Sequence, residues 1–253
     1  MAIWQLGGMT TRLVHMVIDA NDPPRLARFW AAALGWEVVA EEPDEVVVWP
    51  AGFSYPGPAA LPLVFVPVPE PKAGKNRLHL DLASSSAAHQ EQLAARLRDL
   101  GARPADIGQG TVPWVVLADP EGNEFCVLDP RPGYAGAGPV AAVVADCADP
   151  EALARFWESA GGWRRRDQDH GMQALRSPAG LGPYLEFQPD DGPKTVKNRV
   201  HLDVAPHTGD DLQAEVSLLR QAGATPADVG QGTAPWEVLA DPEGNEFCVL
   251  SPR

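Results

Sequence analysis

Apolar and polar positions alternate in a pattern that predicts strands around a single amphipathic helix at the start of the chain. Residues 13–20 are apolar and rich in Val and Ile, as strands are. Asp22 then precedes two prolines, which the first turn of a helix tolerates, and apolar residues recur at helical spacing as far as Leu34. Gly35 ends this helix. Short apolar segments divided by Gly and Pro predict three further strands, at 36–40, 45–49 and 61–66.

The same order of elements then follows a second time. Residues 77–82 predict another strand. Residues 86–100 predict a helix with leucines on one face, which Gly101 ends. Two more strands are expected at 114–117 and 124–128. The pattern therefore predicts two βαβββ units in the first half of the chain.

The second half of the chain repeats the first. The segment ADIGQGTVPWVVLADPEGNEFCVLDPR from Ala105 recurs as ADVGQGTAPWEVLADPEGNEFCVLSPR from Ala227, 122 residues later. KNRLHLDL from Lys75 recurs as KNRVHLDV from Lys197 at the same separation. A repeat of this length, close to that of one domain, indicates two copies of one domain and four βαβββ units. We expect a first domain at 1–131, a Gly- and Ala-rich linker at 132–139 and a second domain at 140–253.

The composition indicates a globular protein with a small-molecule partner. The apolar fraction is 45%, and the formal net charge is −14. Such a charge argues against binding to nucleic acid or to an anionic membrane surface, both of which need basic residues. No run of 18 apolar residues occurs, and the first residues lack the features of a signal peptide. Three cysteines favour reduced thiols over a disulfide framework, so we expect a cytoplasmic protein.

The motifs that open and close each half resemble those of one known family. HMVIDANDPPRLARFW from His15 is similar to the opening strand and helix of the vicinal oxygen chelate superfamily. DPEGNEFCVL at Asp119 and at Asp241 resembles its closing hairpin. That superfamily includes glyoxalase I, extradiol dioxygenases, fosfomycin-resistance enzymes and bleomycin-binding proteins. The resemblance extends from about Leu13 to Arg253. It implies an α+β fold of four βαβββ units forming two tandem glyoxalase-like half-barrel cups, either a monomer that is an internal pseudo-dimer or a homodimer.

The resemblance also implies positions for metal ligands on four strands, in the order His, Glu, His and Glu. Neither half has the full set, and the closing carboxylate is a thiol in both, which argues against glyoxalase I or a standard extradiol dioxygenase. In relatives that exchange units between domains, His15 would face His201 and Glu186 would join His79. The sequence leaves both arrangements open. The residues at these positions are His15, Val64, His79 and Cys126 in the first half, and Ala142, Glu186, His201 and Cys248 in the second.

A His-x-Asp motif in each half carries the clearest candidate chemistry. Residues two apart on a strand share a face, so His79 and Asp81 point into one cup, and His201 and Asp203 do the same in the repeat. Together with His15, the pair His79 and Asp81 would provide two imidazoles and one carboxylate. This set of ligands suits Fe(II) or catalytic zinc. The cofactor is therefore either none or one divalent metal: Fe, Zn, Ni or Mn. The candidate metal ligands are His15, His79 and Asp81 and, in the second half, Glu186 and His201.

The same residues have an explanation that needs no metal. Arg77 and Arg199 share the face of the His-x-Asp motifs, and a buried Asp paired with Arg is satisfied without an ion. A thiol within an apolar strand is more often a core residue than a nucleophile. Tryptophans near the cups indicate a flat or apolar ligand held by stacking, although packing also explains them. The candidate ligand-binding residues are Trp49, Arg77, His79, Asp81, Trp114, Cys126, Arg199, His201, Asp203, Trp236 and Cys248.

Three functions remain open from the sequence, and whether the chain is an enzyme is open with them. The first is metal-independent binding of a small organic molecule, similar to the bleomycin-resistance branch. The second is a divergent metal-dependent lyase, isomerase or dioxygenase that uses His15, His79 and Asp81. The third is an interaction scaffold. If only one cup works, we expect it to be the cup of the first half, because the second half has Ala142 in place of the first His.

Overall fold

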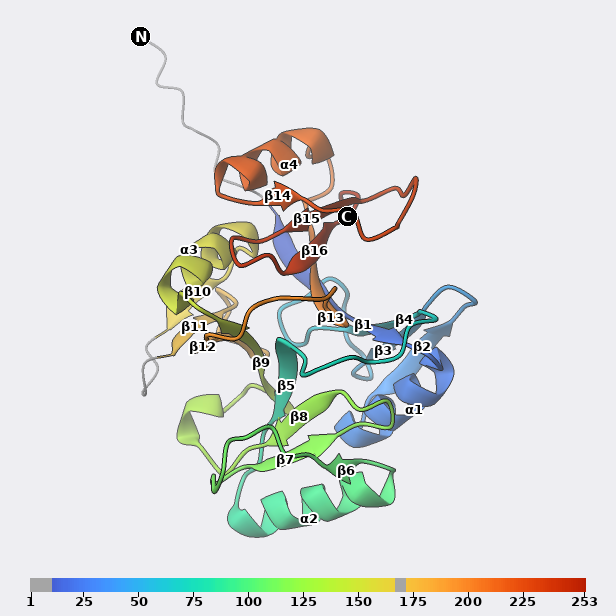
Figure 1. Ribbon diagram of the computed structural model, residues 1–253, viewed down its shortest axis with the longest axis vertical. Helices are drawn as coiled ribbons and strands as arrows, with labels where there is room; N and C mark the ends of the chain where they lie inside the picture. The colour runs from blue at the N-terminus through green and yellow to red at the C-terminus, as the bar shows by residue number, and fades with distance from the viewer. Residues whose placement is uncertain (1–10, 167–171) are drawn as a thin grey trace.

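Four βαβββ units follow one another in the computed structural model, which describes residues 11–166 and 172–253 (Figure 1). The expected order of elements is confirmed. The sequence pattern missed β6 (Arg103–Pro104) and its repeat β14 (Thr225–Pro226), because two-residue strands leave no period to detect. None of the described helices is long and apolar enough to cross a membrane. The expectation about a signal peptide concerns residues that lie mainly outside the described part of the chain.

The first helix begins and ends as the sequence predicts. The side chain of Asp22 accepts a hydrogen bond from the backbone N–H of Arg25, at 3.2 Å. Gly35 ends the helix in the left-handed conformation with φ of +67°, which glycine adopts without steric cost. The helices among the described residues are α1 (Pro23–Leu34), α2 (Ala87–Asp99), α3 (Pro150–Ala160) and α4 (Leu212–Gln221), and a 3₁₀ turn, η1, covers Pro132–Tyr134.

The strands form two mixed sheets of eight strands each. Sheet A has the order β14-β15-β16-β13-β1-β4-β3-β2, and sheet B the order β10-β11-β12-β9-β5-β8-β7-β6. The first unit contains β1 (Arg12–Ala20), β2 (Glu37–Glu41), β3 (Val46–Trp49) and β4 (Leu63–Pro67). The second contains, with β6, β5 (Leu78–Leu82), β7 (Val115–Ala118) and β8 (Glu124–Val127). The third contains β9 (Val140–Cys147), β10 (Arg164–Arg166), β11 (Gln173–Arg176) and β12 (Tyr184–Pro189). The fourth contains, with β14, β13 (Val200–Ala205), β15 (Glu237–Ala240) and β16 (Glu246–Val249).

Each sheet combines one unit from each half of the chain. Strand β1 pairs antiparallel with β13, so that His15 lies opposite Asp203 and Val17 opposite His201. Strand β5 pairs antiparallel with β9, so that His79 lies opposite Val144. Figure 1 shows both pairs at the centre of the molecule. Of the two arrangements that the sequence left open, the structure therefore has the exchanged one.

The helices connect the two sheets through buried aromatic residues. Helix α1 packs on β3 and β4 of sheet A, and the ring of its Trp30 lies 5.0 Å from that of Phe125 in sheet B. The indole N–H of Trp30 donates to the buried carboxylate of Asp119 at 3.2 Å. Trp157 repeats this bond with Asp241, at 3.1 Å. These tryptophans belong to the core, because they lie on the buried faces of α1 and α3.

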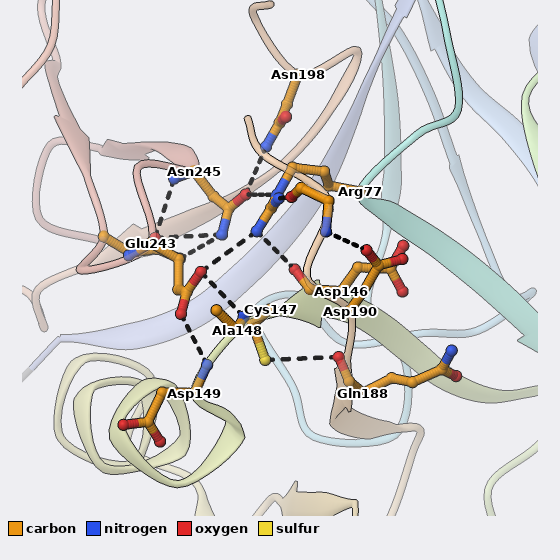
Figure 2. Close-up of polar contacts among 12 residues, drawn as sticks. Arg77, Asp146, Cys147, Ala148, Asp149, Gln188, Asp190, Asn198, Glu243 and Asn245 are labelled. Carbon is orange, nitrogen blue, oxygen red and sulfur yellow. Dashed lines mark hydrogen bonds and ion pairs between the residues drawn. The ribbon is translucent and has the colours of Figure 1, made fainter. Parts of the chain in front are cut away.

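Two arginines that we expected beside the His-x-Asp motifs instead join the sheets. Arg77, just before β5, donates to Asn245 Oδ1 at 3.1 Å and pairs with Glu243 at 3.4 Å, both in the β15–β16 turn (Figure 2). Arg199, just before β13, pairs in the same way with Glu121 of the β7–β8 turn, at 3.0 Å. The expected pairing of these arginines with the Asp of their own motifs is therefore wrong, because both side chains reach across to the other sheet.

Candidate functional site

Four polar side chains meet on sheet B in a cavity of about 650 Å³. They are His79 and Asp81 of β5, Cys126 of β8 and Glu186 of β12; together we call them the sheet B site. The strand register explains why they meet. Asp81 is the register partner of Cys126, and Val144 of β9 lies between His79 and Glu186 as the partner of both. The cavity is also lined by Gln109, Trp114, Asp129, Arg131, Met172 and Gln188.

The carboxylate of Asp81 is buried with one oxygen unsatisfied. Its Oδ1 accepts no hydrogen bond from the residues that the structure describes, and the nearest imidazole nitrogen, Nε2 of His79, is 3.5 Å away. Burial alone would lower the pKa of His79, but its interaction with Asp81 and the charges of Asp81 and Asp146 outweigh burial and raise it. The site therefore presents a buried acceptor beside His79 that a donor group of a bound ligand would satisfy.

Glu186 is fully buried, with 0% of its surface exposed. The hydroxyl of Tyr134 lies 3.0 Å from each of its carboxylate oxygens and donates to them. Burial raises the pKa of Glu186 from 4.5 to about 7, and the charge of Asp81 adds to this effect. The Tyr134 hydrogen bond and the charge of Arg131 oppose it. Near neutral pH this carboxyl is thus divided between its two protonation states.

The equivalent side chains of sheet A form a second cluster, the sheet A site: His15, His201, Asp203 and Cys248. Asp203 lies between the two imidazoles, with Oδ2 at 3.4 Å from His15 Nδ1 and Oδ1 at 3.6 Å from His201 Nε2. The Cys248 sulfur lies 3.6 Å from His201 Nε2. Burial lowers the pKa of His201, against the opposing charge of Asp203. Val64, the partner of Val17 in β1, stands where sheet B has Glu186.

Aromatic rings cover the sheet A site. The ring of Tyr55, from the loop between β3 and β4, stacks on His15 at 5.1 Å with an interplanar angle of 12°. Trp49 stacks on the same Tyr55 at 5.9 Å. Arg253 donates to the Tyr55 hydroxyl at 3.4 Å. Trp49 therefore packs on Tyr55, and its contact with a ligand stays a prediction.

The other two candidate tryptophans differ from each other. Trp114 lines the sheet B cavity, and its indole N–H donates to Gln109 Oε1 at 2.9 Å. The guanidinium of Arg131 lies 5.4 Å from the Trp114 ring. Trp236, the repeat of Trp114, is 40% exposed. Trp114 thus lines a cavity, whereas Trp236 is exposed.

Both candidate thiols are held in their neutral form. Burial raises the pKa of Cys126 well above its usual range, and the neighbouring charge of Asp81 raises it further. Burial and Asp203 have the same effect on Cys248. Because the thiolate is the nucleophile, these environments argue against nucleophilic catalysis by either residue.

The structure divides the predicted metal ligands differently from the sequence expectation. His15 lies on sheet A, whereas His79 and Asp81 lie on sheet B, so these three residues do not share a site. Glu186 and His201 are separated in the same way. Each sheet contains strands from both halves of the chain. The expectation that the cup of the first half works alone is therefore wrong, because no sheet is formed by the first half alone. Two groups of potential ligands, each with ligand atoms within 4.8 Å of one another, are found among the described residues: His79, Asp81 and Cys126, and His201, Asp203 and Cys248.

Sequence reasoning missed two residues of these sites. Tyr134 reaches Glu186 from the predicted linker, and Arg131 lines the sheet B cavity. A single aromatic residue in a Gly- and Ala-rich linker was the available signal for Tyr134. Its contact with β12 depends on tertiary structure that the local pattern does not contain.

The repeated units, the exchanged sheets and the paired sites agree with a comparison against known families. The model of the glyoxalase-like domain matches residues 15–128 and again 142–250. The chain belongs to the glyoxalase-like domain family, with two tandem copies. This membership confirms the resemblance to the vicinal oxygen chelate superfamily and the predicted fold class.

Solved structures of glyoxalase-like proteins share this two-domain fold. Glyoxalase I from Zea mays matches with a TM-score of 0.65 and 16% identity over 95% of this chain and 92% of the maize chain. A Bacillus subtilis protein described as a proposed dioxygenase matches with a TM-score of 0.61 and 14% identity over 97% and 86% of the two chains. At these identities the likeness shows the fold alone. A comparison with curated protein sequences finds no match.

Proposed function

We propose that this glyoxalase-like protein binds a small organic molecule in the sheet B cavity, through direct polar contacts and without a metal ion. The observation that carries the proposal is the cavity of about 650 Å³ whose floor holds the unsatisfied Oδ1 of Asp81. Ligand pockets of roughly 300–1,000 Å³ typically combine apolar walls with a few converging polar groups. The cavity thus favours small-molecule binding over the interaction scaffold.

The charges around the cavity indicate which ligand chemistry it accepts. The one guanidinium in its lining, Arg131, is paired with Asp129 at 2.8 Å. Asp81 is paired only with the imidazole of His79, at 3.5 Å, and its Oδ1 accepts no hydrogen bond from the described residues. A ligand with an amine or hydroxyl donor would satisfy this buried acceptor, and a flat ring would lie against Trp114. We therefore propose an aromatic amine or a related flat molecule with a donor group as the ligand class.

The test compares amines with acids of the same shape. Tyramine and phenethylamine, and phenylacetate as the acidic counterpart, are titrated by isothermal calorimetry and saturation-transfer NMR. We expect the amines to bind and phenylacetate not to bind. Asp81→Asn should weaken amine binding about 10- to 150-fold, because a hydrogen bond to a charged group is worth about 1.5–3 kcal/mol.

The internal repeat supplies the matched control for this experiment. Asp203→Asn makes the same change in the sheet A site and should leave amine binding unaffected. Binding of phenylacetate in preference to the amines, or loss of amine binding with Asp203→Asn but not with Asp81→Asn, would refute the proposal.

A second candidate function belongs to the sheet A site. His201, Asp203 and Cys248 form a group that suits a divalent metal such as zinc, and His15 lies 3.4 Å from Asp203. Oδ1 of Asp203 is buried without a hydrogen-bond partner among the described residues. A metal held there would act as a Lewis acid toward substrate oxygens. The metal-dependent lyase, isomerase or dioxygenase of the second hypothesis would then use His15, His201 and Asp203, in place of the set His15, His79 and Asp81.

Metal analysis of paired variants tests this second function. The wild-type chain and the variants His201→Ala and His79→Ala are purified without an affinity tag, and their metal content is measured by inductively coupled plasma mass spectrometry. A metal lost only in His201→Ala would support a sheet A centre. A metal lost only in His79→Ala would contradict it and would also contradict metal-free binding in sheet B.

A further inference from the structure

A cavity of about 330 Å³, which we call the interior cavity, lies between the two sheets. Sheet A lines it with Met16 of β1 and Leu63 of β4. Sheet B lines it with Leu80 of β5 and Val143 of β9. All four side chains are buried and belong to the core cluster that both sheets share. The interior cavity therefore reaches into the centre of the protein.

The interior cavity is separate from the sheet A and sheet B sites. Neighbouring residues of a strand point to opposite faces of the sheet. Met16 directly follows His15 in β1, and Leu80 lies between His79 and Asp81 in β5. The interior cavity is therefore on the reverse face of each sheet, and no residue of either polar site lines it.

The loop between β3 and β4 and the linker complete the wall of the interior cavity. Most of the residues that they contribute are Ala or Gly, whose short side chains leave the space between the sheets unfilled. Ala51, Gly52 and Ala59 of this loop are exposed, so the interior cavity extends from the core to the surface. The loop packs closely on the one between β11 and β12, because a Cβ atom at Gly182 would overlap the carbonyl oxygen of Pro58. A molecule that enters beside the loop would thus meet a formed pocket.

The chemistry of the lining favours an apolar occupant. Its described residues include no charged side chain, and the indole of Trp36 carries the one nitrogen or oxygen atom among their side chains. Burying an ion or an unpaired hydrogen-bonding group in such surroundings is unfavourable. A buried water molecule also needs two or more polar partners, whereas apolar cavities in proteins take up hydrocarbons. An uncharged molecule would instead be stabilised by dispersion contacts with the walls.

We propose that the interior cavity binds an uncharged hydrocarbon of about two fused rings. A cavity of about 150 Å³ lined by Leu, Ile and Phe holds benzene, and the interior cavity is roughly twice as large. The rings of Trp36 and Phe53 in the lining favour a flat occupant. This proposal goes beyond amine binding in sheet B, because it concerns the opposite face of the sheet and a ligand without a hydrogen-bond donor.

NMR of the methionine methyl groups, labelled with ¹³C, tests the proposal. Met16 lines the interior cavity and Met172 lines the sheet B cavity, so their signals report on the two cavities separately. The signals are assigned from the variants Met16→Leu and Met172→Leu. Titration with naphthalene should shift the Met16 signal to saturation and leave the Met172 signal unchanged. Its charged counterpart 1-naphthoate should bind there at least about tenfold more weakly, because burial leaves its carboxylate unpaired.

The internal repeat supplies a matched pair of variants. Leu80 lines the interior cavity, whereas Leu202, its equivalent in β13, is buried in the same core without lining it. Leu80→Phe should fill the space and weaken naphthalene binding at least about tenfold. It should also lower the urea midpoint less than Leu202→Phe, because a larger side chain destabilises a core where it has no space. Ala60→Leu fills the same space from the loop and keeps the test decisive if Leu80→Phe does not fold.

The outcomes separate this proposal from the proposed function. It is overturned if naphthalene shifts neither methyl signal or only that of Met172, or if 1-naphthoate binds as tightly as naphthalene. Wild-type naphthalene affinity in the folded filling variants would also overturn it. The amines should shift the Met172 signal and not that of Met16. A Met172 shift with amines and no naphthalene binding would therefore leave the proposed function standing, and the opposite result would remove the proposed function alone.

Discussion

Replacing Glu186 with glutamine should make the protein more stable at alkaline pH. Burial raises the pKa of this carboxyl from 4.5 to about 7, so its ionised form is unfavourable in the folded chain. Below about pH 4.5 both folded and unfolded chains hold the proton, and the group has no net effect. Between 4.5 and 7 the unfolded chain releases the proton while the folded chain keeps it, so stability falls as pH rises. Above about pH 7 the full cost applies.

The magnitude follows from the two pKa values. Each unit of pKa corresponds to about 1.4 kcal/mol, so the change from 4.5 to about 7 costs the folded wild type up to about 3 kcal/mol above pH 7. Glutamine cannot ionise, and its amide oxygen can still accept the hydroxyl proton of Tyr134. The difference in the free energy of unfolding between Glu186→Gln and the wild type should therefore shift in favour of the variant by up to about 3 kcal/mol between pH 4.5 and pH 8.

Urea unfolding at a series of pH values from 4.5 to 8.5, followed by tryptophan fluorescence, measures this effect. Comparing the two proteins at each pH largely cancels the contributions of other groups, His79 among them. As a companion, Tyr134→Phe removes the hydrogen bond that lowers the Glu186 pKa, so its stability should continue to fall to a higher pH than that of the wild type. A free-energy difference between Glu186→Gln and wild type that stays constant across the range would refute the reasoning.

Three further outcomes are expected from the contacts in the core and at the interface. Trp30→Phe removes a donor from the buried carboxylate of Asp119 and should lower the free energy of unfolding by about 1–3 kcal/mol; unchanged stability would contradict this. Arg77→Ala breaks the contacts that join the sheets and should lower the free energy of unfolding by about 3 kcal/mol, whereas Arg28→Ala, at an exposed ion pair, should lower it by less than about 1 kcal/mol. Equal losses of the two variants in urea unfolding would show that the Arg77 contacts do not contribute to stability. Cys126 should resist Ellman's reagent at pH 8 in the folded chain, because burial raises the pKa of its thiol; rapid labelling of this residue, located by mass spectrometry, would disprove that.

Local patterns in the sequence were sufficient for the elements and for the repeat. The strand at 13–20, the Asp22 cap and the Gly35 stop each depend on residues close together in the chain, and the structure has all three. The shared face of His79 and Asp81 also follows from strand geometry alone. These features could be predicted because backbone conformation and side-chain alternation are set within a few residues.

The composition of each site was decided by the tertiary structure. Pairing β1 with β13 and β5 with β9 joins segments from opposite halves, and an arrangement within each half would use strands of the same pattern. Because the two arrangements do not differ in local preference, the sequence pattern left open whether His15 would meet His79 or His201. The reach of Arg77 to the other sheet and the contact of Tyr134 with Glu186 depend on the same choice. The sequence by itself determined which side chains each strand presents, and packing between distant segments determined which of them face one another.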